Sequence, residues 1–166
     1  MLQPLVIALQ LLTRIPVPSL SVIDPIAVGR SILFYPVVGL IIGSLLALVN
    51  WLLVDASIAV TAAILTVVWL IITGAIHIDG LADTADGWLG GFGNKEKTLE
   101  IMKDPTSGPA GVAAIVSVLL LNFSAMQQIT EDFDYLALIA IPLIARHMAR
   151  VMMLTTPYAR YWKIFE

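Results

Sequence analysis

The chain has no cysteine and few charged residues. The absence of cysteine excludes disulfides, iron–sulfur clusters and thiolate metal sites, although it carries no information about the redox compartment. Charged residues make up 13% of the 166 residues, against about 25% in soluble domains, while 59% are hydrophobic. A soluble core of this size cannot hide so much apolar surface. We therefore expect a membrane protein. Dense basic clusters are also lacking, so we expect no nucleic-acid partner.

Four charge-poor stretches are long enough to cross a lipid bilayer. They cover residues 31–54, 56–76, 108–128 and 135–154. A helix rises about 1.5 Å per residue, so roughly 20 residues cross a hydrocarbon layer of about 30 Å. Backbone groups in lipid must bond within their own segment, which favours helices. The sequence predicts an all-α, multi-pass membrane protein with a single membrane domain over residues 1–166.

The N-terminal segment is apolar but too short to cross. Residues 1–12 carry no charge, and Pro16 and Pro18 prevent a helix from continuing beyond them. We expect a short membrane-associated helix that dips into the bilayer or lies along its surface. A peripheral anchor without further function is the alternative.

Basic and acidic residues separate onto opposite sides of this four-span arrangement. All nine Lys and Arg residues, including Arg160 and Lys163, fall on the side that receives both termini and the segment 77–107. The positive-inside rule places that side in the cytoplasm. We therefore predict a cytoplasmic (inner) membrane protein whose active face is cytoplasmic. The opposite side receives only acidic residues, namely Asp55, Glu131, Asp132 and Asp134.

Three aspartates follow the second predicted span at helical spacing. Asp79, Asp83 and Asp86 are four and three residues apart, so on a helix their side chains share one face. Carboxylates this close repel one another unless a cation lies between them. Hard oxygen ligands suit Mg²⁺, usually with substrate phosphates completing the coordination shell. The spacing indicates a metal site, and the alternative is a solvated helix end capped by Asp79.

Other ionisable residues on the same side extend the candidate site. His77 is a candidate general base, or a hydrogen-bond donor at the membrane interface. Lys103 could hold a phosphate and Asp104 could add a metal ligand, although surface solvation explains both equally well. Arg146 and Arg150 are four residues apart and could clamp phosphates across from the aspartates, or reach lipid headgroups instead.

A glycine-rich stretch separates the aspartates from the next predicted helix. Residues 88–93 are predicted to form a loop that acts as a hinge or cradles a phosphate, although the stretch lacks a Walker pattern. Asn94 is a suitable N-cap for a cytoplasmic helix over residues 95–103. Phosphate-bearing substrates fit this combination of carboxylates and basic residues, because phosphoryl transfer depends on positioning and charge neutralisation.

Four motifs followed by Gly108 and Gly111 carry a resemblance to a known family. They are residues 12–18 (LTRIPVP), 34–39 (FYPVVG), 77–87 (HIDGLADTADG) and 99–104 (LEIMKD). In their order and spacing the sequence resembles the cobalamin synthase family, the adenosylcobinamide-GDP ribazoletransferases. The resemblance implies a Mg²⁺-dependent membrane enzyme of the last steps of vitamin B12 assembly. Such an enzyme joins α-ribazole, or its 5′-phosphate, to adenosylcobinamide-GDP and releases GMP. It also implies that Asp79, Asp83 and Asp86 are metal-binding positions.

The resembled family continues well beyond residues 158–160 with further spans. We therefore expect a C-terminally truncated member that is poorly active alone or needs a partner chain for the remaining helices. Two other functions stay open, a truncated, non-catalytic membrane subunit and a membrane transporter. A transporter would need ionisable residues within its spans, and the first three predicted spans contain none.

Overall fold

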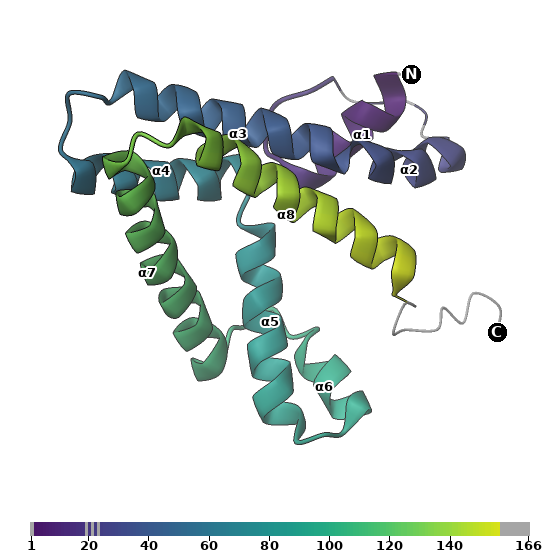
Figure 1. Cartoon of the computed structure of the whole chain (residues 1–166). Helices are drawn as coiled ribbons and strands as arrows, with labels where there is room; N and C mark the ends of the chain where they lie inside the picture. The colour runs from purple at the N-terminus through teal and green to yellow at the C-terminus, as the bar shows by residue number, and fades with distance from the viewer. Residues whose placement is uncertain (1, 19, 21, 23, 157–166) are drawn as a thin grey trace.

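The computed structural model describes residues 2–18, 20, 22 and 24–156, and every regular element in these ranges is a helix (Figure 1). The all-α prediction is confirmed. Arg160 and Lys163, which the charge pattern assigns to the cytoplasm, lie outside the described residues. The helices are α1 Leu2–Leu12, α2 Pro25–Ser31, the short 3₁₀ helix η1 Ile32–Phe34, α3 Tyr35–Leu52, α4 Ile58–Thr73, α5 Ile76–Gly91, α6 Lys95–Ile101, α7 Pro109–Glu131 and α8 Tyr135–Thr155.

Three of the described helical segments are long and apolar enough to cross a membrane. They are the continuous run Pro25–Leu52, α7 and α8, and a fourth results if α4 and α5 form one span with an 86° bend. Large apolar side chains cover their outer surfaces; Leu120 and Leu121 of α7, for example, are 64% and 71% exposed. Such surfaces require lipid as solvent. The chain is a multi-pass membrane protein, as predicted.

The bend between α4 and α5 lies at two residues in the left-handed conformation. Gly74 ends α4 with φ +63°, and Ala75 follows with φ +55°. Left-handed residues end helices by turning the chain away from the helix axis. The predicted second span, residues 56–76, is thus interrupted after Thr73, and α5 points away from α4 toward α6 and the start of α7 (Figure 1).

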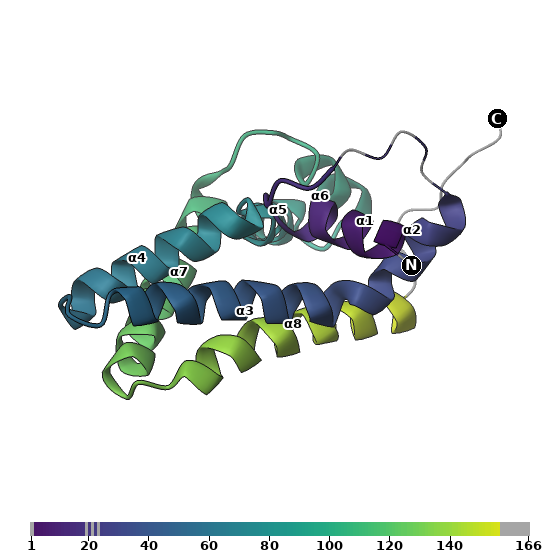
Figure 2. The ribbon, with the colours of Figure 1, turned by 90° about the horizontal axis from the view of Figure 1, so that it is seen from above.

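Helices α3 and α8 form the closest helix pair, and they run side by side in both views (Figures 1 and 2). A Cβ atom on Gly43 would lie 2.6 Å from Ile139 Cα, and one on Gly39 would lie 2.5 Å from the Pro142 carbonyl oxygen. Small residues four apart allow membrane helices to approach this closely. The buried core extends from this contact to α1, α4 and α7, and includes Tyr35, Val38, Ile42, Leu46, Leu65, Met126 and Leu138.

The predicted N-terminal helix is present as α1, which packs against α2 and α3. Its residues Ala8 and Leu12 are buried in the core. After α1 ends, the Arg14 backbone N–H donates a hydrogen bond to the Ile72 carbonyl at 2.7 Å. This bond fixes the N-terminal segment beside the end of α4, next to the bend that positions α5.

Candidate functional site

The three aspartates of the predicted metal site lie on α5, which confirms the helical spacing. Asp79 is exposed in the first turn, and Asp83 is half-buried one turn later. Residues four apart are neighbours on a helix surface. Neither carboxylate accepts a hydrogen bond from the part of the chain that the structure describes, so both pairs of oxygens remain available to a ligand.

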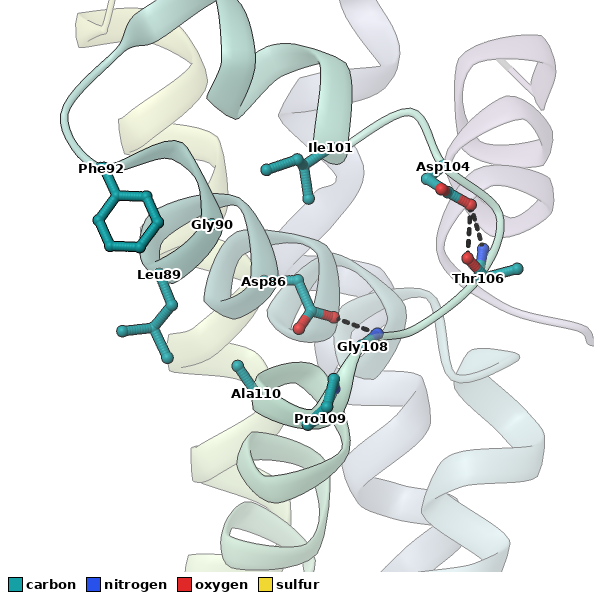
Figure 3. A pocket seen from close by; sticks show the side chains of 10 residues that line it. All are labelled: Asp86, Leu89, Gly90, Phe92, Ile101, Asp104, Thr106, Gly108, Pro109 and Ala110. Atoms are coloured by element: carbon teal, nitrogen blue, oxygen red, sulfur yellow. Dashed lines mark hydrogen bonds between the residues drawn. The ribbon is translucent and has the colours of Figure 1, made fainter.

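Asp86 differs from the other two because it binds the start of α7. Its Oδ2 accepts a hydrogen bond from the Gly108 N–H at 2.7 Å (Figure 3), and its Oδ1 accepts one from the Gly111 N–H at 2.9 Å. The first amides of a helix have no partner within it, and α7 has no side-chain cap of its own. A Cβ atom at Gly108 or Gly111 would collide with this carboxylate. Asp86 therefore caps α7 from a neighbouring helix.

A pocket of about 650 Å³ opens beside Asp86, where α5, α6 and α7 meet (Figure 3). Asp104 is its second acidic residue. The Thr106 hydroxyl and backbone N–H both donate to Asp104 Oδ1, at 2.6 and 2.9 Å, and these bonds hold the pKa of the carboxyl below its usual range. The pocket is lined by Asp86, Leu89, Gly90, Phe92, Ile101, Asp104, Thr106, Gly108, Pro109 and Ala110.

The predicted metal ligands form two pairs. Asp79 and Asp83 are one helical turn apart, whereas Asp86 and Asp104 line the pocket. Within the described ranges, no three His, Asp or Glu side chains lie close enough together to hold a metal ion. Mg²⁺ commonly takes only one or two protein carboxylates and completes its shell with water and phosphate oxygens. The carboxylate pair of Asp79 and Asp83 therefore fits Mg²⁺.

The prediction of a glycine-rich loop over residues 88–93 is wrong for most of its length. Residues 88–91 form the last turn of α5, because α6 packs closely against this turn and Gly91 contacts Thr98. Packing here outweighs the low helix propensity of glycine. A phosphate-cradling loop is therefore absent from these four residues.

The prediction that Asn94 is the N-cap of α6 is confirmed. Its side-chain oxygen accepts hydrogen bonds from the backbone N–H groups of Glu96 and Lys97, at 3.0 and 3.1 Å. The helix ends at Ile101, two residues earlier than predicted. Lys103 follows that end as an exposed residue.

The remaining candidates lie near the bend and on α8. His77 is in the first turn of α5, and Arg146 lies on α8. Arg150 is half-buried one turn beyond Arg146. The structure thus separates the predicted arginine pair into one buried and one half-buried side chain.

Arg146 is the most deeply buried charged side chain among the described residues, at 4% exposure. Burial excludes the alternative in which its side chain reaches lipid headgroups. Arg146 lines a mostly apolar cavity of about 150 Å³, whose other polar groups come from Trp69 and Asn122. The sequence analysis did not identify these two neighbours. Asn122 could have been found, because it is a polar residue within a predicted span.

Comparisons with known proteins match almost the whole length of the chain. The profile of the cobalamin-5-phosphate synthase family matches residues 4–165. The chain is 48% identical over 157 residues to the adenosylcobinamide-GDP ribazoletransferase of Acinetobacter baumannii (strain ACICU), covering 95% of this chain and 64% of that protein. It is likewise 48% identical to that of Pseudomonas fluorescens (strain Pf0-1), covering 65% of it, and 49% identical to that of Stutzerimonas stutzeri (strain A1501), covering 64%.

The chain thus spans a little under two thirds of the length of these curated relatives. No solved structure matches it. The family match includes α5, α6, α7 and α8, and so contains the aspartate helix and both of its neighbours. The chain therefore belongs to the cobalamin-5-phosphate synthase family.

Proposed function

We propose that this chain contributes the metal-binding centre of an adenosylcobinamide-GDP ribazoletransferase. The enzyme would join α-ribazole, or its 5′-phosphate, to adenosylcobinamide-GDP and release GMP in cobalamin biosynthesis. One observation carries the proposal: within the matched region, α5 presents Asp79 and Asp83 one turn apart with no other partner among the described residues. The relatives bear the name of this activity.

The same pair would hold Mg²⁺, whose charge would neutralise the diphosphate of the substrate. Asp86 has one lone pair left on each oxygen after its bonds to α7, so its contribution to the metal is secondary to its capping of that helix. Asp104 stays a predicted ligand on the far side of the pocket. Its Oδ1 is already engaged by Thr106, which leaves Oδ2 available.

The transfer exchanges a phosphoanhydride bond for a phosphodiester bond. A hydroxyl oxygen of ribazole bonds to the phosphorus attached to cobinamide, and the P–O bond to the GMP phosphate breaks. The GMP oxygen leaves with the bonding electron pair, and the ribazole hydroxyl gives up its proton. His77 is the proposed acceptor of that proton, because it lies two residues before Asp79 in the first turn of α5. Lys103 and Arg150 are proposed to neutralise charge on the departing nucleotide.

The proposed active face is cytoplasmic. Lys95, Lys97 and Lys103 belong to α6 and the segment after it, on the same side as the pocket. Basic residues beside membrane spans are retained in the cytoplasm. That side also supplies nucleotide-activated substrates, which would reach α5 without crossing the bilayer.

The proposal is tested by following GMP release from adenosylcobinamide-GDP in membranes that hold the chain. Two sets of membranes are compared, one with the chain alone and one in which the C-terminal segment of the Acinetobacter relative is produced with it. We expect release that requires both α-ribazole and Mg²⁺ in at least the second set. Uptake of the substrate without GMP release would instead support a transporter, and release that ignores α-ribazole would contradict the proposal.

A further inference from the structure

We propose that Arg146 forms a phosphate-binding site in the cavity between α3, α4, α7 and α8, distinct from the pocket beside Asp86. Its Nε and Nη2 atoms are buried and find no hydrogen-bond partner among the described residues. A buried cation without a partner is strongly unfavourable, whereas the same cation bonded to an anion is stable. The burial of Arg146 therefore points to an anionic occupant of the cavity.

Most of the residues that line the cavity are apolar, and its polar groups come from Arg146, Trp69 and Asn122. Arginine and the tryptophan indole can only donate hydrogen bonds, and the amide of Asn122 can also donate. None of the residues that line the cavity carries a carboxylate. A group with several acceptor oxygens and a negative charge matches these donors, and guanidinium groups bind phosphate through two parallel hydrogen bonds.

The size of the cavity limits the occupant to a small group. Its volume of about 150 Å³ resembles that of an engineered protein cavity that binds benzene, at roughly 150 Å³. Pockets for complete cofactors or drug-sized ligands measure about 300–1,000 Å³. A single phosphoryl group therefore fits, while the rest of its molecule must extend outside the cavity.

The position of the cavity places such a phosphoryl group beside the aspartate helix. The cavity that Arg146 lines also contacts Trp69, one turn before α4 ends at Thr73, and α5 begins shortly after that end, whereas the larger pocket is at the other end of α5. A phosphoryl group could belong to a soluble diphosphate or to a phospholipid headgroup. The inference concerns binding alone and does not depend on the proposed transferase activity.

The test measures thermal unfolding of the full chain in nanodiscs of a phosphate-free galactolipid (digalactosyldiacylglycerol), in EDTA, with increasing inorganic pyrophosphate. We expect pyrophosphate to raise the melting temperature of the wild type. Arg146→Met should weaken the apparent affinity by about tenfold or more, because hydrogen bonds to a charged group are lost. Arg30→Gln, which removes an exposed basic residue of α2, should behave like the wild type.

If Arg146→Met folds poorly, the melting temperatures measured without ligand distinguish a binding role of Arg146 from a structural one. A binding role predicts that Arg146→Met without ligand is as stable as the wild type or more stable, since an unpaired buried charge is removed. A merely structural role predicts a clear loss of stability, with the response to pyrophosphate retained, and this result would overturn the proposal. Arg146→Lys should bind with intermediate affinity, because an ammonium group cannot make the paired bonds.

A second set of nanodiscs distinguishes the source of the phosphate. If a lipid headgroup occupies the cavity, phosphatidylglycerol should raise the melting temperature of the wild type but not of Arg146→Met, and added pyrophosphate should have little further effect. If a soluble diphosphate occupies it, pyrophosphate should act in both kinds of disc. The proposal fails if neither phosphate source stabilises the protein in a manner that depends on Arg146.

Discussion

The carboxylate of Asp86 accepts a hydrogen bond from the backbone N–H of Gly108 at 2.7 Å, across 22 residues of sequence. A second bond, from Gly111 to the other carboxylate oxygen, fixes both helices in register. One aspartate of the predicted metal triad thus joins α5 to a membrane-spanning helix. Through Asp86, the position of the candidate metal site on α5 therefore depends on how α7 packs.

Asp86→Asn should destabilise the contact between α5 and α7. The asparagine amide presents an NH₂ group to one of the two backbone donors, so one hydrogen bond is lost. Hydrogen bonds to charged groups contribute about 1.5–3 kcal/mol, and we expect a loss in that range for the free energy of unfolding. Thermal unfolding in detergent measures it, with Asp55→Asn at an exposed loop position as control. Equal stability of the two variants would show that the bonds contribute little.

Gly43→Ala should separate α3 from α8. The added Cβ would lie 2.6 Å from Ile139 Cα, and backbone atoms cannot move aside as a flexible side chain does. Overpacking of this kind costs about 1–3 kcal/mol. Gly29→Ala in α2 is the matched control, because no atom lies within 4 Å of its Cβ position. A similar melting temperature for both variants would contradict the close helix contact.

The orientation of the chain can be tested with single cysteines, since the natural sequence has none. Cysteine at position 14 or 97 should react with a membrane-impermeant thiol reagent added from the cytoplasmic side only. Cysteine at position 132 should react only from the opposite side, because basic residues are retained in the cytoplasm. Labelling of position 132 from the cytoplasm would refute the predicted topology.

The sequence predicted the helices well because their causes are local. Long apolar stretches predicted the spanning helices, and the side chain of Asn94 predicted the start of α6. The i, i+4, i+7 spacing of Asp79, Asp83 and Asp86 was also sufficient to place them on one helix face. Such periodicities depend only on neighbours in the sequence.

Long-range contacts account for what the sequence could not predict. The helical state of residues 88–91 results from packing against α6, and the capping of α7 by Asp86 joins residues far apart in the chain. The spacing of Arg146 and Arg150 predicted a shared face but not that Arg146 alone would be buried. Burial depends on which helix packs against which, and periodicity within one helix does not contain that information.

Binding of Mn²⁺, followed by electron paramagnetic resonance on the purified chain in nanodiscs with pyrophosphate present, tests the central claim most directly. Mn²⁺ suits the same oxygen ligands as Mg²⁺ and has a signal that changes on binding. The account predicts bound Mn²⁺ in the wild type and in Asp55→Asn. In the double variant Asp79→Asn and Asp83→Asn, affinity should fall by at least about tenfold, because both carboxylate ligands are lost. Equal Mn²⁺ binding by the double variant and Asp55→Asn would show that the aspartate face of α5 is not the metal site.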